Sequence, residues 1–189
     1  KSILTAGILR ILKQDGFRAA PFKSQNMALN SYATPEGLEI GRAQAVQAEA
    51  AGVPCHTDMN PLLLKPSSEH TSQVVLLGKP IGDRNAYEYF RKEGREELRK
   101  VVNESYNRLA TRYNPIVMEG AGSISEINLR DVDLVNMPMA KHAGADVFLV
   151  ADIDRGGVFA SVYGSILLQT PEERSLIKGI IINKFRGDI

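Results

Sequence analysis

The sequence contains a single cysteine and no tryptophan, and neither sign of charge is in excess. Cys55 has no second cysteine to pair with, so we expect a reducing compartment, with the cytoplasm as the default. The 23 Lys and Arg against 22 Asp and Glu argue against a dedicated nucleic-acid binder, which would carry a basic excess. The longest apolar runs, such as residues 147–151, fall far short of the roughly 20 residues that span a bilayer. With no signal-peptide pattern visible either, we expect no membrane partner.

Histidines are also few, and they are poorly spaced for metal binding. None of His56, His70 and His142 has metal-ligand spacing with another histidine or with Cys55. We therefore predict no zinc site. Cys55 is interpreted as a small structural residue, and no Ser-His-Asp or Cys-His arrangement is apparent.

Short apolar runs alternate with helical patterns along the chain. Helical spacing predicts helices over residues 3–12, 37–51, 85–113, 133–143 and 157–168. Strands are predicted at residues 17–22, 73–77, 116–118, 147–151 and 179–182, and the Ser-, Asn- and Gln-rich residues 23–36 are predicted to be a loop. Continuous apolar runs are typical of strands buried on both faces. We therefore predict one α/β domain over residues 1–189, with a mainly parallel, twisted sheet and helices on both faces.

Polar residues follow each of four predicted strands. The endings are Lys23-Ser24-Gln25-Asn26, Glu119-Gly120-Ala121-Gly122, the run 152–157, and Asn183-Lys184. In a parallel sheet the carboxyl ends of all strands lie on one edge, where ligands bind. Four such endings predict a site along that rim, although strand ends are commonly polar for solvation alone.

Lys1-Ser2 opens a predicted helix that leads into a parallel strand, as the end of a P-loop does. In that interpretation Lys1 reaches the β- and γ-phosphates, Ser2 ligates Mg²⁺, and the helix N-terminus supplies amide donors. The alternative is a capping serine beside a surface lysine. We expect a strand and a Gly-rich loop upstream of Lys1.

Glu119 precedes Gly-Ala-Gly, where backbone can approach a ligand closely and a carboxylate can hold Mg²⁺. Its alternative is an ordinary glutamate at a strand end. Asp152 and Asp154 stand beside Arg155 and a Gly pair that can form an anion nest, so Arg155 could contact a phosphate or a carboxylate; helix capping is the alternative. Asn183 could pair with a purine edge, or it could be a turn asparagine.

Several strings match one known family, and together they extend along the whole chain. They are residues 21–30 (PFKSQNMALN), 39–48 (EIGRAQAVQA), 60–66 (NPLLLKP), 119–123 (EGAGS), 152–161 (DIDRGGVFAS) and 182–188 (INKFRGD). On these residues the chain resembles the cobyric acid synthases, whose N-terminal domain is similar to dethiobiotin synthetase and has a P-loop NTPase fold.

The resemblance implies an ATP-dependent amide ligase of the glutamine amidotransferase class. Such an enzyme amidates four peripheral carboxylates of a corrin ring, converting adenosylcobyrinic acid a,c-diamide to cobyric acid through an acyl phosphate in cobalamin biosynthesis. The implied cofactors are ATP and Mg²⁺, and the implied partners are the corrinoid and a glutaminase domain that supplies ammonia. We expect that glutaminase domain to lie beyond the end of this chain.

The resemblance also implies residue roles. Lys1, Lys23 and Glu119 are implied as catalytic, with Lys23 similar to the lysine of dethiobiotin synthetase that bridges the γ-phosphate and the substrate. The implied nucleotide contacts are Lys1, Ser2, Asn183 and Lys184, and the implied metal ligands are Ser2, Glu119 and Glu39. Glu39 is included because Arg42 occupies the place of the second Mg²⁺ ligand of dethiobiotin synthetase. The implied substrate contacts are Ser24, Gln25, Asn26, Asn30, Asp154 and Arg155.

Three alternatives stay open. A P-loop ATPase acting as a switch or partitioning module would share Lys1-Ser2 and the Asn183 corner, but it would not need the Lys23–Met27 string. The sister enzyme that amidates the a and c carboxylates is a closer rival, and the residues 24–27 argue against it. A degenerate binding module is the third alternative. The oligomeric state is also left open, and a homodimer is one of the states considered.

Overall fold

The computed structural model describes residues 1–66, 72–82 and 95–187. These residues form two compact units, Lys1–Ala121 and Gly122–Ile189. Each unit combines a pair of parallel strands with helices, as the predicted α/β class requires. That residues 1–189 act as one domain stays a prediction.

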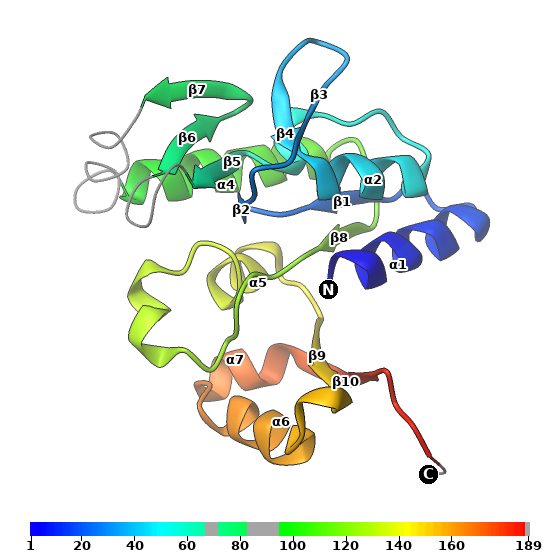
Figure 1. Ribbon diagram of the computed structural model, residues 1–189, viewed down its shortest axis with the longest axis vertical. Coiled ribbons are helices and arrows are strands. Elements are labelled where there is room, and N and C mark those ends of the chain that lie inside the picture. Colours follow the sequence, from blue (N-terminus) through cyan, green and yellow to red (C-terminus); the bar gives the residue numbers. More distant parts are fainter. Residues whose placement is uncertain (67–71, 83–94, 188–189) are drawn as a thin grey trace. The chain divides into compact units, whose positions relative to one another are not determined.

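In the first unit, helices α1 (Ser2–Gln14) and α2 (Arg42–Ala51) lie side by side along strands β1 (Ala20–Phe22) and β8 (Ile116–Met118) (Figure 1). The two strands pair in parallel, with Phe22 opposite Met118. The predicted strand at 17–22 therefore begins three residues later than expected. An apolar cluster joins α1 to the end of α2, to the residue before β1 and to β8. Its buried members are Leu9, Ala19 and Ala51, and Leu12, Val53 and Val117 pack against them.

A second, mixed sheet of the first unit corrects the predicted loop at residues 23–36. Its strand order is β2 (Gln25–Met27), β5 (Leu62–Pro66), β6 (Ser72–Leu76) and β7 (Lys79–Gly82), with β2 parallel to β5. Strand β3 (Ser31–Ala33) pairs antiparallel with β4 (Glu39–Gly41). The loop prediction was wrong for residues 25–27 and 31–33, because these residues find main-chain partners on β5 and β4, which local composition cannot reveal.

The helix predicted from residue 37 begins only at Arg42. Residues Glu39–Gly41 are already strand β4, and Gly41 is extended at φ −61° and ψ 134°. The main-chain N–H of Gly41 donates to Asn60 Oδ1 at 2.9 Å. Asn60 follows the short 3₁₀ helix η1 (Thr57–Met59). A contact distant in sequence therefore sets the start of α2.

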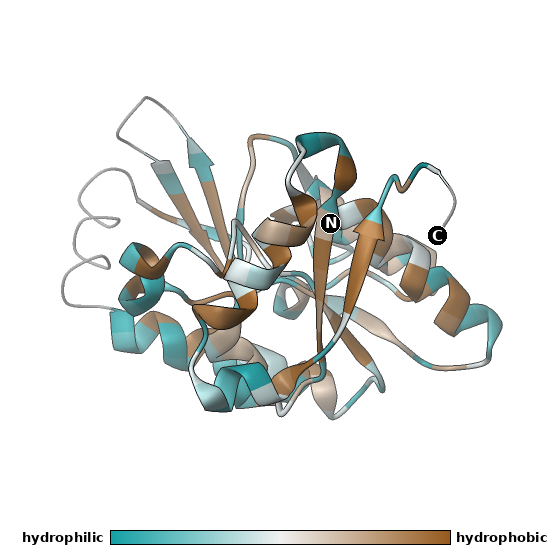
Figure 2. Ribbon diagram, turned by 90° about the horizontal axis from the view of Figure 1, so that it is seen from below, coloured by the Kyte–Doolittle hydropathy of each residue, from teal (hydrophilic) through white to brown (hydrophobic). Residues whose placement is uncertain are grey.

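In the second unit, β9 (Val147–Asp152) and β10 (Ile177–Asn183) pair in parallel, with Asp152 opposite Asn183. Strand β10, which leads to the C-terminal label, is brown along most of its length in Figure 2. The remaining elements of this unit are η2 (Ile127–Val132), α5 (Met137–Ala143), η3 (Ile153–Arg155), α6 (Val158–Leu167) and α7 (Pro171–Leu176). The helix predicted at 133–143 is shorter than expected. Helix α5 begins at Met137, and Asp133 and Asn136 precede its first turn.

The prediction that the apolar strands are buried on both faces was wrong for β9 and β10. Phe148, Val150 and Ile180 are 57%, 38% and 46% exposed, and the residues between them are more covered. This alternation has the period of two that places successive side chains on opposite faces. One face of the strand pair is therefore covered while the other is open.

The long helix predicted over residues 85–113 is described only as α4 (Arg95–Ala110), since residues 83–94 lie outside the described part. Its buried side chains include Leu98, Val102 and Leu109. Among the helices of the described ranges, none combines the length and the apolar character needed to cross a membrane.

Candidate active site

The parallel register of β1 and β8 brings Lys23 and Glu119 together. Each residue directly follows its strand, and the Glu119 N–H donates to the carbonyl of Phe22 at 2.9 Å. Lys23 Nζ then lies 3.0 Å from Glu119 Oε1. The pair is buried, with Lys23 9% and Glu119 5% exposed. Burying an ion pair costs desolvation free energy, so a buried pair at two strand ends points to a functional role.

Ser2 adds a hydroxyl to the same carboxylate. It is the first residue of α1, and its Oγ donates to Glu119 Oε1 at 2.8 Å. Glu119 therefore lies at the N-terminus of α1, where the helix dipole favours negative charge. The contact places two oxygen-bearing side chains side by side, and oxygen is the ligand atom that Mg²⁺ prefers.

Gln47 is a fourth member of this cluster, and it is not among the site residues predicted from the sequence. Its Nε2 donates to Glu119 Oε2 at 2.7 Å and to the main-chain oxygen of Ser2 at 3.3 Å. Gln47 lies on the buried face of α2, only 1% exposed, beside Ala48 and Ala51. The sequence feature that could have identified Gln47 is its position on the same helical face as the small apolar residues Ala48 and Ala51.

These contacts keep Glu119 ionised. Desolvation by burial would raise its pKa, but the hydrogen bond from Gln47, the charge of Lys23 and the hydrogen bonds from Ser2 and Lys23 hold the pKa below its ordinary value. The carboxylate is therefore charged at neutral pH, as a metal ligand must be.

Lys1 belongs to the same charged group. Burial lowers its pKa, the nearby charge of Lys23 lowers it further, and Glu119 partly opposes both effects. Lys1 therefore lies close enough to Lys23 and Glu119 for their charges to act on it, and a catalytic role for these three residues stays a prediction.

The predicted substrate residues differ in exposure. Ser24 is 1% exposed, and its Oγ has no hydrogen-bond partner among the residues described. Asn26 is also buried, and its Nδ2 donates to Gln44 Oε1 at 3.0 Å. Gln25 is half-buried and Asn30 is exposed. An orphaned buried hydroxyl directly after Lys23 is consistent with a ligand that completes the site.

Within the part of the chain that the structure describes, Glu39 pairs with Lys65 and not with the Glu119 cluster. Its Oε1 accepts from Lys65 Nζ at 2.6 Å, and hydrogen bonds from Lys65 and Ser31 hold its pKa below the ordinary value although desolvation would raise it. Arg42 packs over the ring of Tyr32, 5.2 Å from the centroid. A metal role for Glu39 stays a prediction.

The second unit holds a separate charged cluster at the ends of β9 and β10. Lys184 Nζ lies 2.8 Å from Asp152 Oδ2 and 3.3 Å from Asp154 Oδ2, while Arg186 pairs with Asp154 at 3.0 Å. Hydrogen bonds to these two aspartates raise the pKa of Lys184. Asn183 is opposite Asp152 in the register. The polar residues that follow the predicted strands therefore meet in pairs: those after β1 and β8 in the first unit, and those after β9 and β10 in the second. That all four groups lie along one edge of a sheet stays a prediction.

Gly156 and Gly157 both adopt positive φ, at 68° and 58°. Both conformations favour glycine, and anion binding by this Gly pair stays a prediction. The contacts of Asp154 and Arg155 with a substrate are not tested by this geometry and stay predictions.

A family model described as the CobQ/CobB/MinD/ParA nucleotide binding domain matches residues 1–189, the whole of the chain. The chain belongs to this family. The match confirms the predicted P-loop-type nucleotide-binding fold, with Lys1-Ser2 at its N-terminal end.

Proteins named cobyric acid synthase are similar to this nucleotide-binding domain along its full length. The relative from Phocaeicola vulgatus is 82% identical, that from Parabacteroides distasonis 65%, and that from Yersinia enterocolitica 58%, each over 189 residues. The chain spans only 38%, 38% and 36% of the lengths of these three relatives. The resemblance expected from the sequence is confirmed, and the rest of each relative has no counterpart in this chain.

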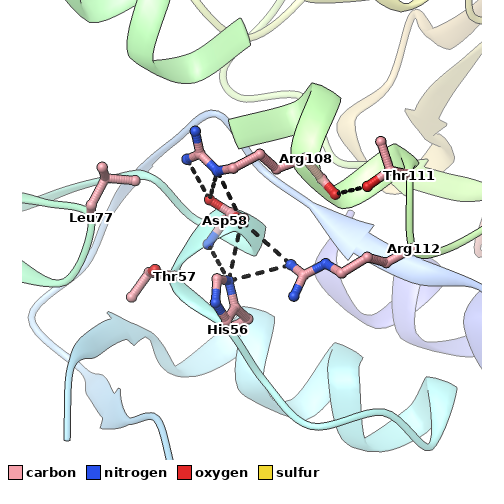
Figure 3. A pocket seen from close by; sticks show the side chains of 7 residues that line it. All are labelled: His56, Thr57, Asp58, Leu77, Arg108, Thr111 and Arg112. Carbon is pink, nitrogen blue, oxygen red and sulfur yellow. Dashed lines mark hydrogen bonds and ion pairs between the residues drawn. The ribbon is translucent and has the colours of Figure 1, made fainter. Parts of the chain in front are cut away.

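A pocket of about 470 Å³ also lies in the first unit of the nucleotide-binding domain (Figure 3). It surrounds Asp58, whose carboxylate accepts from Arg108 at 2.7 Å and from Arg112 at 3.3 Å. His56 Nδ1 accepts from the Asp58 N–H at 3.1 Å. The aspartate is buried while both arginines are about half exposed, so the cluster ties α4 to η1. It shares no residue with the Glu119 cluster.

Proposed function

We propose that this chain is the ATP-binding, carboxylate-activating domain of a cobyric acid synthase acting in the cytoplasm. The observation that carries the proposal is the convergence of Ser2, Lys23 and Gln47 on the buried carboxylate of Glu119, with Lys1 coupled to it electrostatically. The choice of this reaction is supported by the similar relatives that are named cobyric acid synthase. The glutaminase that supplies ammonia is assigned to the part of the relatives outside this chain.

The reaction requires a carboxylate to become reactive toward ammonia. A carboxylate resists attack because it is anionic and has a poor leaving group. Bound Mg²⁺·ATP supplies the γ-phosphoryl group that turns it into an acyl phosphate and the cation that offsets the phosphate charge. The domain contributes positioning and electrostatic stabilisation, which are the main sources of catalysis in phosphoryl transfer.

The residues of the site fit both ATP and Mg²⁺. Ser2 Oγ and the Glu119 carboxylate are neighbouring oxygen donors for Mg²⁺, and the depressed pKa keeps Glu119 ionised. Lys1 and Lys23 neutralise the phosphate oxygens that gain charge, and Lys23 also orients the substrate carboxylate. The N–H groups of the first turn of α1 bind phosphate oxygens. Asn183 and Lys184 are assigned to the nucleotide base.

The corrinoid is assigned to the polar residues that follow Lys23. Ser24 offers a buried hydroxyl without a partner in the described chain, and Gln25, Asn26 and Asn30 offer amides. Hydrogen bonds from these groups suit the carboxylates and amides at the edge of a corrin ring. Asp154 and Arg155 of the second unit complete the proposed substrate contacts.

The test is ATP turnover by the full-length protein with cobyrinic acid a,c-diamide and ammonia. The expected result is ADP release that depends on the corrinoid, with amidated corrinoid appearing in step. ADP release at the same rate without corrinoid would replace the proposal with an ATPase switch. Turnover with cobyrinic acid but not with its a,c-diamide would replace it with the sister synthase.

A further inference from the structure

Three buried amide side chains connect Glu119 to strand β2. Gln44 is 0%, Gln47 1% and Asn26 6% exposed. A buried amide is costly unless it is hydrogen-bonded, and the other buried residues of α2 are alanines. Apolar side chains would fill this helix face at lower cost, so the amides require an explanation other than packing.

The three amides form a continuous series of hydrogen bonds. Gln47 donates to Glu119 Oε2 at 2.7 Å, Gln44 Nε2 donates to Gln47 Oε1 at 3.5 Å, and Asn26 Nδ2 donates to Gln44 Oε1 at 3.0 Å. One end of the series is the proposed metal ligand. The other end is the middle residue of β2, the strand to which we assign substrate contacts.

The direction of the series follows from the charge of Glu119. An ionised carboxylate only accepts hydrogen bonds, and so does the main-chain oxygen of Ser2, so Gln47 must turn its NH₂ group toward them. The Gln47 oxygen then requires a donor, which is the NH₂ group of Gln44. The Gln44 oxygen in turn requires the NH₂ group of Asn26. The charge of Glu119 therefore determines the orientation of the Asn26 amide through three successive hydrogen bonds.

The backbone at Gly41 holds the series tightly. A Cβ at this position would lie 2.7 Å from Gln44 Oε1 and 3.0 Å from Asn60 Oδ1, and it would also overlap Asn26 Nδ2. Asn60 accepts from the Gly41 N–H and donates to the carbonyls of Lys23 and Leu62. The amides therefore have little room for other side-chain arrangements.

We propose that Asn26, Gln44 and Gln47 form an amide relay that couples the nucleotide and metal site at Glu119 to the substrate strand β2. The inference rests on the proposed function for the identity of its two ends. Gln44 and Gln47 are positioning residues, because they act through Glu119 and Asn26. Binding of Mg²⁺ and nucleotide restrains Glu119, and the relay passes that restraint to β2 before any corrinoid arrives.

The experiment measures amide hydrogen exchange in the full-length protein with and without Mg²⁺ and the non-hydrolysable analogue AMP-PNP. In the wild type, we expect the analogue to slow exchange over residues 25–33 by at least about fivefold, the lower end of ordinary coupling between sites. Gln44→Met keeps the side-chain length but removes both polar atoms. It should abolish that protection while the affinity for AMP-PNP changes by less than about threefold.

Gln169→Met is the matched control. Gln169 is also buried, and its Nε2 donates to the carbonyls of Ile124 and Ser165, but it belongs to the second unit and not to the relay. The control should lose stability in a similar way yet keep the protection of residues 25–33. If Gln44→Met does not fold, Asn26→Ala interrupts the relay at its other end and should abolish the same protection.

Protection that persists in Gln44→Met or in Asn26→Ala overturns the relay. A wild type that binds AMP-PNP without protecting residues 25–33 overturns it as well, while leaving the proposed function standing. A wild type that binds no Mg²⁺·AMP-PNP overturns both proposals. Since no corrinoid is present, failure of the corrin assignment does not affect the result.

Discussion

Ser2 and Glu119, which are 117 positions apart in sequence, meet in a 2.8 Å hydrogen bond between a helix start and a strand end. The bond joins the residue that opens α1 to the carboxylate that follows β8. These are the two places to which we assign the phosphate groups and the metal ion. Their contact links two sequence signals that are ambiguous when each is taken alone.

Replacing Glu119 with glutamine should abolish corrinoid-dependent ATP turnover. The change keeps the shape of the side chain but removes the charge that we assign to Mg²⁺ and leaves Lys23 buried beside a neutral amide. Removing one partner of a buried ion pair costs about 3–5 kcal/mol, so Glu119→Gln should fold with a lower free energy of unfolding. Steady-state ADP release and urea unfolding of the full-length protein measure the two effects. Full activity would remove Glu119 from the metal role.

The stability provided by Glu119 should depend on pH. Its pKa is lower in the folded chain than the value of about 4.3 expected when unfolded, so its contribution is complete above about pH 5. The contribution is lost as pH falls through the folded pKa, because protons then bind the native carboxylate too. The difference in unfolding free energy between the wild type and Glu119→Gln should therefore shrink as the pH falls below about 5. A difference that is constant over this range would contradict the prediction.

Two Gly-to-Ala changes should act in opposite directions. At Gly41 the backbone is extended and accepts alanine, but the new methyl group would meet Asn26, Gln44 and Asn60, and overpacking typically costs about 1–3 kcal/mol. At Gly7, inside α1, nothing lies within 4 Å of the new methyl group. Gly7→Ala should stabilise the protein by about 0.5–1 kcal/mol. Denaturant unfolding of both variants gives the comparison, and equal shifts would show that the space at Gly41 is not restrictive.

The two arginines around Asp58 should contribute unequally (Figure 3). Arg108 donates to Asp58 through both Nε and Nη2, at 3.2 and 2.7 Å, whereas Arg112 donates through one nitrogen at 3.3 Å. Both side chains are about half exposed, so solvent screening reduces both contributions. Arg108→Ala should cost about 1–2 kcal/mol and Arg112→Ala less than about 1 kcal/mol. Thermal unfolding of the two variants checks the order, and the reverse order would contradict it.

Local sequence patterns were enough to predict several elements of each unit. Helical spacing located α1 and α6, and the apolar runs located β8, β9 and β10, because the burial of each element repeats with its own period. Polar residues after the strands located Lys23 and Glu119, because parallel strands end at one edge. Lys1 and Ser2 were located by the motif that opens α1.

Contacts between distant segments decided the rest. Residues 25–27 are polar and became strand β2 because β5 supplies main-chain partners, and Glu39 pairs with Lys65 in preference to the Glu119 cluster. Gln47 became a partner of Glu119 only when α2 packed beside β1. A sequence determines which side chains are available and how each segment tends to fold, because those preferences are local. Which donor reaches which acceptor depends on how the segments pack, and only the tertiary structure decides that.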